Sequence, residues 1–538
     1  MKQTCTASLL AASLILFSCR PVPPAVKPPM MGWSSWNAFE IGISDSLIMQ
    51  QADLLVSTGL AKAGYTNVNI DDGFFGFRDS TTGCMTPNPL RFPGGIEKVT
   101  AHIHGLGLKA GIYSDAGANT CGSYGNGDIF GRGAGLYGHT DQDAQLYFND
   151  WNFDFIKIDY CGAQRLKLEP KERYTRIREV IDSVSDHAVA LNICRWHFPG
   201  IWAAEIADSW RISGDLLPEW KSVRSVVEKN LYLSAYAGNG HYNDMDMLVV
   251  GYSKKPCAIS WTKYDELCLE EESAHFGMWC IMSSPLALGF DLAAMPEETF
   301  ELITNPELIA INQDPLGLQA YVIQHEGESY ALVKDVIKLG GKQRALALYN
   351  PSDEPVDFDL PIEKLELEGK VRLRDLILRE DLPDAEASIR MSVPAHSAKI
   401  LSVKGSKRLE TKHLEAEWSF IPAYNDIGPE GGKYIEVDGA SCGAGVLNLG
   451  GSPENRMEWR NIIRRKKCHH TASIRYKALR DCDAYLEVNG KRIPLKLKAS
   501  DDFISTKAQI VLAKGTNTIA LGNDEARLPV TFDSVDLL

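Results

Sequence analysis

The 538-residue sequence has few positive charges and lacks long apolar runs after its first twenty residues. It contains 56 Lys and Arg against 70 Asp and Glu, which gives a formal net charge of −14. This balance argues against a nucleic-acid-binding protein, because such a protein presents a basic face. No stretch after the first twenty residues has the length and apolar character of a transmembrane helix.

The sequence also lacks the short motifs of two common cofactor sites. Its 12 cysteines are scattered, and no CxxC pair or Cys/His spacing is typical of zinc. No glycine-rich turn follows the first predicted strand, as it would in a sheet that binds a dinucleotide. Hydrophobic residues make up 44% and charged residues 23%, values typical of a soluble globular protein long enough for several domains.

The first 29 residues are predicted to be a targeting segment followed by a tether. Lys2 precedes an apolar region over 7–17, which is too short for a stable bilayer anchor. The segment LFSC that follows resembles a bacterial lipobox, which predicts a lipoprotein-type signal peptide over 1–19 with lipidation of Cys19. A plain secretory signal is the alternative. The proline-rich stretch over 20–29 is typical of a stiff tether, and we expect an exported, membrane-anchored lipoprotein, periplasmic or at the cell surface.

Apolar segments that end in polar residues alternate with helix-like stretches over residues 30–318. Eight strands separated by helices over roughly 290 residues are what a (β/α)₈ barrel requires. An open doubly wound sheet is the competing fold, and the missing phosphate-binding turn disfavours it. The strand candidates are residues 31–36, 65–73, 108–117, 153–162, 189–196, 209–215, 242–251 and 280–292.

Helical periodicity largely disappears after residue 318. Over 319–405, apolar and polar residues alternate with period two, which predicts an antiparallel β-sandwich. A polar stretch over 405–414 is predicted to be a linker. Residues 415–538 are again rich in strand-like segments, with turn signals such as Asn489-Gly490. The predicted fold is therefore multidomain, a TIM barrel followed by two β-sandwiches.

Carboxylates gather at the predicted strand ends. In FDFIKIDYCG an apolar run contains Lys157 and continues into Asp159. One such aspartate would be unremarkable, since Asp commonly caps helices. Five strand ends that deliver carboxylates to one barrel mouth instead predict an active site, because barrel enzymes build theirs there. The strand-end residues are Trp36, Asp71, Asp72, Tyr113, Asp115, Lys157, Asp159, Arg211, Asp215, Asp244 and Asp246.

Two carboxylates across a sugar-sized pocket are what glycoside hydrolysis needs, one as nucleophile or base and one as proton donor. Eight motifs occur in order: PPMMGWSSWNAF, NIDDG, RFPGGIEKVTAHIHGLGLKAGIYSDAG, FDFIKIDYCG, SWRISGD, YNDMDML, HFGMWCIMSSPLALGFDL and INQDPLGL. On these motifs, the chain from Met30 to about Gly405 resembles the α-galactosidase / α-N-acetylgalactosaminidase family of glycoside hydrolases, family 27. They span about 290 residues, which makes the resemblance specific.

The resemblance implies a role for each matching residue. Asp159 would be the nucleophile and Asp215 the general acid/base of a retaining reaction with a covalent glycosyl-aspartate intermediate, the two carboxyl groups lying about 5–5.5 Å apart. Cys121 and Cys161 match a family disulfide that closes a loop of about 40 residues. No metal or organic cofactor is implied. The implied substrate contacts are Trp36, Asp71, Asp72, Tyr113, Lys157, Arg195, Arg211 and Asp246.

The sequence departs from the family pattern at the loop that recognises the C2 substituent. Arg195 stands where α-galactosidases have a Glu, and Phe198 follows as a bulky residue. Large side chains there leave little room for an acetamido group, so the expected partner is an oligo- or polysaccharide with terminal α-galactosyl residues. An α-N-acetylgalactosaminidase and a β-L-arabinopyranosidase are alternatives within the family. A non-catalytic glycan-binding surface lipoprotein is the alternative from another class.

The last region resembles a carbohydrate-binding β-sandwich more weakly, through its opening LEAEW and a later NLGG and MEWRNI. The sequence allows two roles for this region, a glycan-binding accessory domain or a purely structural domain. Trp418, Tyr424 and Trp459 are candidate sugar platforms, although core packing explains them equally well.

Overall fold

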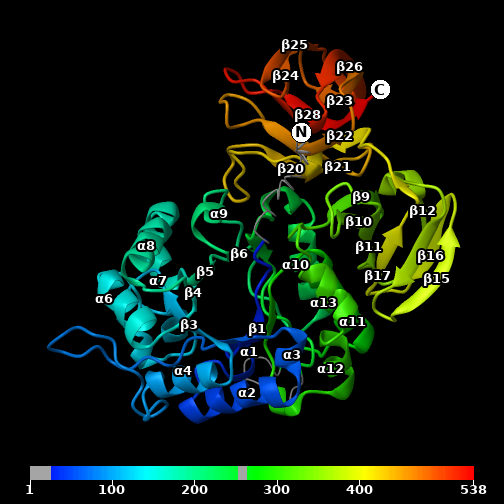
Figure 1. Cartoon of the computed structure of the whole chain (residues 1–538). Coiled ribbons are helices and arrows are strands. Elements are labelled where there is room, and N and C mark those ends of the chain that lie inside the picture. Colours follow the sequence, from blue (N-terminus) through cyan, green and yellow to red (C-terminus); the bar gives the residue numbers. More distant parts are fainter. Residues whose placement is uncertain (1–25, 253–262) are drawn as a thin grey trace, which may run out of the picture.

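The computed structural model describes residues 26–252 and 263–538 (Figure 1). The predicted signal peptide over 1–19, its lipidation site Cys19 and most of the tether over 20–29 lie outside the described residues. Across the two described ranges, no helix is both long enough and apolar enough to cross a bilayer. The chain forms a barrel, a second β-domain packed beside it, and a C-terminal β-domain above both.

The barrel consists of eight parallel strands in the order β7-β6-β5-β4-β3-β2-β1-β8. A parallel bridge between Leu248 and Leu288 joins the two ends of this sheet. The (β/α)₈ barrel predicted from the sequence is thereby confirmed. The strands are β1 Met31–Ser34, β2 Asn67–Asn69, β3 Lys109–Asp115, β4 Phe155–Asp159, β5 Ala190–Ile193, β6 Ser209–Arg211, β7 Tyr242–Asp244 and β8 Leu286–Leu288.

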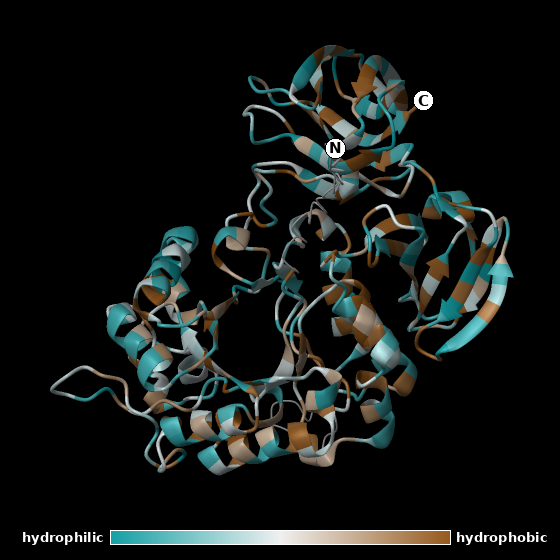
Figure 2. Ribbon diagram, viewed as in Figure 1, coloured by the Kyte–Doolittle hydropathy of each residue, from teal (hydrophilic) through white to brown (hydrophobic). Residues whose placement is uncertain are grey.

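Helices surround the barrel and turn their apolar faces toward it (Figure 2). One difference from the sequence-based elements is at the eighth strand candidate, because Cys280 and Ile281 end α11 and β8 begins only at Leu286. The described α-helices are α1 Trp36–Phe39, α2 Asp45–Ser57, α3 Leu60–Ala63, α4 Ile96–Gly105, α5 Cys121–Gly125, α6 Thr140–Gln145, α7 Cys161–Arg165, α8 Pro170–Val184, α9 Ala203–Ile206, α10 Trp220–Asn230, α11 Leu269–Ile281, α12 Glu297–Ile303 and α13 Pro306–Asn312.

The second domain is built on a six-stranded antiparallel sheet in the order β15-β14-β17-β11-β10-β9. One face of this sheet packs on α11 of the barrel, so all seven residues of β10 are buried. The other face forms a separate core with the β12–β16 pair. The strands are β9 Tyr321–Glu326, β10 Ser329–Asp335, β11 Gln343–Asn350, β12 Val356–Pro361, β13 Leu367–Glu368, β14 Val371–Asp375, β15 Glu380–Ala385, β16 Ser388–Val393 and β17 Ser397–Lys404.

The C-terminal domain packs a sheet containing β20, β21, β28, β23 and β26, extended by β19, on a sheet of β22, β27, β24 and β25. The predicted linker is not all irregular, because β18 pairs with β13 and β19 pairs with β28. The strands are β18 Lys407–Arg408, β19 His413–Glu415, β20 Lys433–Glu436, β21 Ala444–Leu447, β22 Met457–Arg464, β23 Cys468–Ala478, β24 Cys482–Val488, β25 Lys491–Leu497, β26 Ser500–Leu512, β27 Gly515–Gly522 and β28 Val530–Leu537.

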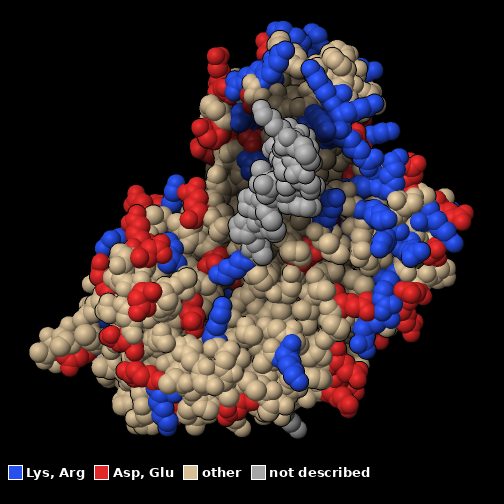
Figure 3. Space-filling model, in the orientation of Figure 1, with Lys and Arg blue, Asp and Glu red and all other residues tan. Residues whose placement is uncertain are grey.

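Charge is unevenly distributed over the surface. On the face shown in Figure 3, Lys and Arg side chains gather over the two β-domains rather than over the barrel. The three candidate sugar platforms of the C-terminal region all take part in packing. Trp459 is 2% exposed, Trp418 lies against Tyr321 with ring centroids 4.7 Å apart, and Tyr424 lies 5.1 Å from the ring of Tyr236. Their positions favour the structural interpretation of these residues.

Candidate active site

A cavity of about 410 Å³ opens at the carboxyl ends of the barrel strands. Its size is within the usual range for small-molecule sites. Of the ten residues predicted to be catalytic or to contact substrate, all except Arg195 line this cavity. Those nine are Trp36, Asp71, Asp72, Tyr113, Lys157, Asp159, Arg211, Asp215 and Asp246.

Asp159 ends strand β4 on the floor of the cavity, in register with Asp115 of β3. Its neighbour two positions earlier, Lys157, reaches across to Asp71, with Nζ 3.0 Å from Oδ2. Burial raises the pKa of the Asp159 carboxyl, and the ammonium of Lys157 opposes this rise. Lys157 therefore compensates charge on two carboxylates that arrive from different strands.

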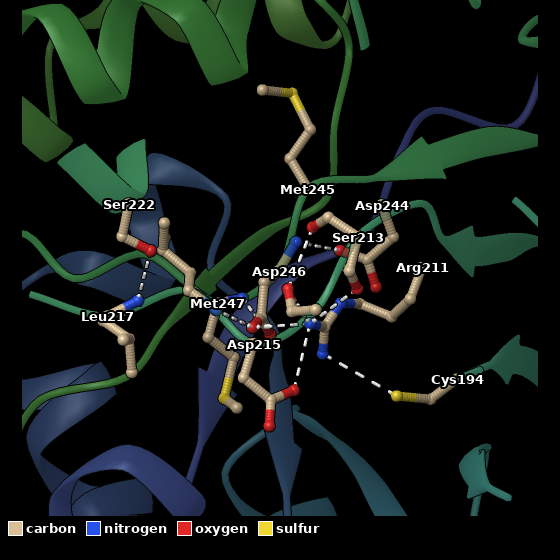
Figure 4. A network of polar contacts seen from close by, with 12 residues as sticks. Cys194, Arg211, Ser213, Asp215, Leu217, Ser222, Asp244, Met245, Asp246 and Met247 are labelled. Carbon is tan, nitrogen blue, oxygen red and sulfur yellow. Dashed lines mark hydrogen bonds and ion pairs between the residues drawn. The ribbon is translucent and has the colours of Figure 1, made fainter. Parts of the chain in front are cut away.

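Arg211 forms the second charged group of the site (Figure 4). Its Nη2 lies 2.9 Å from Asp246 Oδ2 and 3.1 Å from Asp215 Oδ1. The Arg211 side chain is 3% exposed, whereas that of Asp215 is 62% exposed. Asp246, at φ 83°, also accepts a hydrogen bond from the Leu216 amide at 2.8 Å. Arg211 thus compensates Asp246 and Asp215, while Asp215 keeps its carboxyl accessible from the cavity.

Asp72 is held by backbone amides on the opposite wall. Its carboxylate accepts hydrogen bonds from Gly122 N at 2.7 Å and from Gly73 N at 2.8 Å. Burial raises the pKa of Asp72 to about 7, although these hydrogen bonds act in the opposite direction. Asp71 lies beside it and accepts a hydrogen bond from the Asp72 amide at 2.9 Å. The adjacent pair therefore offers acceptor oxygens to a polyhydroxylated ligand.

A disulfide between Cys121 and Cys161 borders the cavity, with Cα atoms 5.3 Å apart. Cys161 follows the Asp159 strand end by two residues and begins α7, while Cys121 begins α5. Tyr124 and Asn126, which follow Cys121, line the same cavity. The pairing implied by the family resemblance is present, and it ties a wall of the cavity to the strand end that bears Asp159.

Arg195 lies elsewhere than the resemblance predicted. Its guanidinium lies over the ring of Tyr160, 5.0 Å from the centroid, and Arg195 is not among the residues that line the cavity. Trp196 lines the cavity instead and adopts a left-handed backbone conformation, φ 64°. This conformation is uncommon for a bulky residue and turns consecutive side chains in different directions. The loop after β5 therefore presents an indole, not a guanidinium, to the cavity.

Two of the strand-end carboxylates act within the fold. Asp115 accepts hydrogen bonds from Gly117 N at 2.6 Å and Gly162 N at 3.1 Å, and Asp244 accepts one from Asn192 Nδ2 at 2.7 Å. Among the described residues, the group with metal-ligand spacing is Asp115 with Cys121 and Cys161. Because those two sulfurs bond to each other, they offer no thiolate to a metal.

Comparison with known proteins supplies the family. A family model described as "Alpha galactosidase A" matches residues 28–314, more than half of the chain. The chain belongs to this family, family 27 of the glycoside hydrolases. Alpha-galactosidase 3 of Arabidopsis thaliana is 36% identical over 375 residues, which cover 69% of this chain and 80% of that protein.

Two further relatives of this family-27 hydrolase agree. Alpha-galactosidase A of Cellvibrio japonicus is 36% identical over 345 residues, 62% of this chain and 78% of that protein. The crystal structure of alpha-galactosidase I from Mortierella vinacea matches with a TM-score of 0.63 and 28% identity, over 71% of this chain and 98% of that one. The chain is therefore a glycoside hydrolase.

The family-27 motifs do not reveal every residue of the cavity. Those missed by the sequence are Asn37, Tyr124, Gly125, Asn126, Trp196 and Met247. Asn37 and Met247 directly follow predicted site residues, and Trp196 directly follows Arg195. Their positions next to predicted residues could therefore have identified these three as candidates. Tyr124, Gly125 and Asn126 follow the disulfide cysteine Cys121, in a stretch that none of the eight motifs covers.

Proposed function

We propose that the chain is a retaining α-galactosidase that removes terminal, non-reducing α-D-galactosyl residues from oligo- or polysaccharides. The observation that supports this most strongly is the presence of Asp159 and Asp215 in one cavity at the barrel's carboxyl end. Asp159 is buried beside the cation Lys157. This position suits a nucleophile, because the carboxyl group must be ionised to attack and a neighbouring cation favours the ionised form. The Asp215 side chain is accessible. This exposure suits a general acid/base, which must contact both the leaving group and the attacking water.

In the proposed mechanism, the Asp159 carboxylate attacks the anomeric carbon while Asp215 donates a proton to the departing glycosidic oxygen. The glycosyl-Asp159 ester is then attacked by water, whose proton returns to Asp215. The Lys157 and Arg211 cations hold the surrounding carboxylates in position through the ion pairs with Asp71 and Asp246. These steps leave the anomeric configuration unchanged because two inversions occur in sequence.

The sugar's identity rests on two walls of the cavity. Both Asp71 and Asp72 line the cavity, and by the family resemblance they match the pair that holds the 4- and 6-hydroxyls, so Asp72 would lose a partner in a sugar that lacks the C6 arm. That argues for galactose over β-L-arabinopyranose. From the β5 loop, Trp196 supplies the bulk that the sequence had assigned to Arg195 and Phe198, neither of which lines the cavity, and this favours a free 2-hydroxyl over an acetamido group. We further propose attachment to a membrane through lipidated Cys19.

The test is hydrolysis of three aryl glycosides, the α-D-galactoside, the α-N-acetyl-D-galactosaminide and the β-L-arabinopyranoside. We expect the α-galactoside to be cleaved fastest, and Asp159→Asn to lower its kcat by on the order of 10³-fold or more. The matched control is Asp208→Asn. Asp208 lies just before β6, at the amino end of that strand, and accepts a hydrogen bond from Leu191 N at 2.8 Å.

The control variant should retain wild-type kcat, and proton NMR of the first product should show the α-anomer. Faster cleavage of either of the other glycosides would overturn the assignment of the substrate, but Asp159 would remain the proposed nucleophile. Full activity in Asp159→Asn would overturn the mechanism itself. If all three glycosides stay intact with the wild-type protein, the α-galactosidase proposal fails.

A further inference from the structure

The loop that follows β5 connects the catalytic centre to the C-terminal domain. It begins at Cys194, whose Sγ accepts a hydrogen bond from Arg211 Nη1 at 3.7 Å. Trp196 then lines the cavity, and Phe198 ends the connection, buried to 1% exposure. Five consecutive residues thus run from the charged network around Arg211 to the surface of another domain.

Phe198 is anchored by residues of the C-terminal domain. Its backbone amide donates a hydrogen bond to Asp426 Oδ2 at 3.0 Å, although the two residues are 228 positions apart. Its ring lies 5.3 Å from that of Tyr424 and 5.0 Å from that of Tyr236 in the barrel. A charged acceptor and an aromatic contact therefore act on the same residue.

The segment that presents Asp426 is itself docked on the barrel. Ile421 N donates a hydrogen bond to the Tyr236 hydroxyl at 3.1 Å, and the hydroxyls of Tyr236 and Tyr434 lie 2.7 Å apart. Lys433 donates to the carbonyl of Asn425, the residue before Asp426. In Figure 1 the loops of the C-terminal domain descend toward the barrel on the side of α9. The segment that carries the acceptor is thus held by hydrogen bonds in which Phe198 takes no part.

We propose that Asp426 is a positioning residue for substrate recognition, which holds the β5 loop through the Phe198 amide and thereby fixes Trp196 in the cavity wall. Trp196 needs such support, because its φ of 64° is costly for a non-glycine residue and persists only where the surroundings impose it. The C-terminal domain then completes the active site of the barrel. The proposal rests on the proposed function only in taking this cavity as the substrate site.

The test compares Asp426→Ala with Asp426→Asn and with a matched control, Asp481→Ala. Alanine removes the acceptor, whereas asparagine keeps a side-chain oxygen that can accept from Phe198 N. Asp481 also accepts a backbone amide, Ala499 N at 2.8 Å, but both partners belong to the C-terminal domain. Asp426 is solvent-exposed, so its replacement should leave the protein folded.

Two measurements decide the matter on the full chain. In Asp426→Ala we expect KM for the aryl α-galactoside to rise about 3- to 10-fold with kcat within about 2-fold, because loss of a charged hydrogen bond loosens binding rather than chemistry. Hydrogen exchange at the Phe198 amide should accelerate by about tenfold or more. Asp426→Asn should restore both values toward wild type, and Asp481→Ala should change neither.

Equal KM and equal exchange in Asp426→Ala and Asp481→Ala would overturn the proposal. So would a lower unfolding temperature with unchanged KM and exchange, since that describes a merely structural contact. The exchange measurement does not depend on turnover. If the wild-type protein cleaves none of the glycosides, the proposed function fails, while accelerated exchange confined to Asp426→Ala still supports the positioning of the loop.

Discussion

At the level of single residues, Asp159 is a buried carboxyl whose negative charge is compensated by a neighbouring lysine. Its Oδ1 is shielded from solvent and has no hydrogen-bond partner among the residues the structure describes. Burial alone would therefore favour the neutral acid, which cannot attack a sugar. Lys157 opposes that effect and at the same time binds Asp71, so the removal of one lysine would disturb both the proposed nucleophile and a proposed ligand contact.

Asp115→Asn should remove a pH dependence of stability. Burial raises the pKa of Asp115 from 3.8 in the unfolded chain to about 7, so between about pH 4 and 7 only the folded chain keeps the proton. Raising the pH across this window favours the unfolded chain; the stabilising contribution is complete below about pH 4 and lost above about pH 7. The full effect is up to about 4 kcal/mol, at about 1.4 kcal/mol per pH unit.

The measurement is urea unfolding of the wild type and of Asp115→Asn at several values from pH 4 to 8. Asp115 does not line the cavity, so its contribution can be measured without a substrate. We expect the free energy of unfolding of the wild type, relative to the variant, to decrease with pH. Parallel curves for the two proteins would contradict the prediction.

At the level of elements, short loops that follow the barrel strands form much of the cavity wall. The disulfide between Cys121 and Cys161 joins the first residues of α5 and α7, one on the cavity wall with Tyr124 and one just behind Asp159. Backbone amides of the same loops hold the carboxylates: Gly122 donates to Asp72, as described above. We therefore expect the rigidity of these two loops to affect the geometry of Asp159, the proposed nucleophile.

Replacing both cysteines, Cys121→Ser with Cys161→Ser, should destabilise the protein by about 3–4 kcal/mol. The bond closes a loop with a sequence separation of 40, which limits the conformations of the unfolded chain. Thermal unfolding measures the effect, and the KM for the aryl α-galactoside should rise as well. Cys84→Ser, at a free cysteine of the barrel, is the control. An unchanged unfolding temperature in the double variant would contradict the prediction.

At the level of the whole molecule, the three domains are joined through buried contacts rather than flexible connections. The sheet that contains β10 packs on α11, and Lys334 of β10 reaches the loop after α11 and the helix α13 of the barrel domain. Its ammonium donates to Ser283 Oγ and to the Ile311 carbonyl, both at 2.7 Å. Burial lowers the pKa of Lys334 to about 7. The interface between barrel and second domain therefore contains a titrating group.

Lys334→Met should flatten the rise of stability with alkaline pH. Between about pH 7 and 10.5 the folded chain holds a neutral amine that the unfolded chain protonates, so raising the pH through this window favours folding. From pH 7 to 10.5, the free energy of unfolding of the wild type should increase relative to that of the variant by up to about 5 kcal/mol. Thermal unfolding of both proteins across this range tests it, and a constant difference would refute it.

The sequence alone determined the barrel and the gathering of its polar residues. Both follow from local patterns: apolar strand segments alternate with amphipathic helices, and a polar residue such as Asp159 or Asp215 ends a segment. Because parallel strands in a barrel all point their carboxyl ends to one side, residues at those ends must meet. Nine of the predicted residues therefore share one cavity, even though their roles were implied only by resemblance.

Tertiary structure alone decided which side chains of a loop face the cavity and what supports that loop. Arg195 and Trp196 are adjacent in the sequence, and the left-handed backbone at Trp196 directs the indole into the cavity while Arg195 lies over Tyr160. Likewise, the hydrogen bond between Phe198 and Asp426 joins two domains. Such features depend on contacts between distant segments, which no periodicity or motif in either segment encodes.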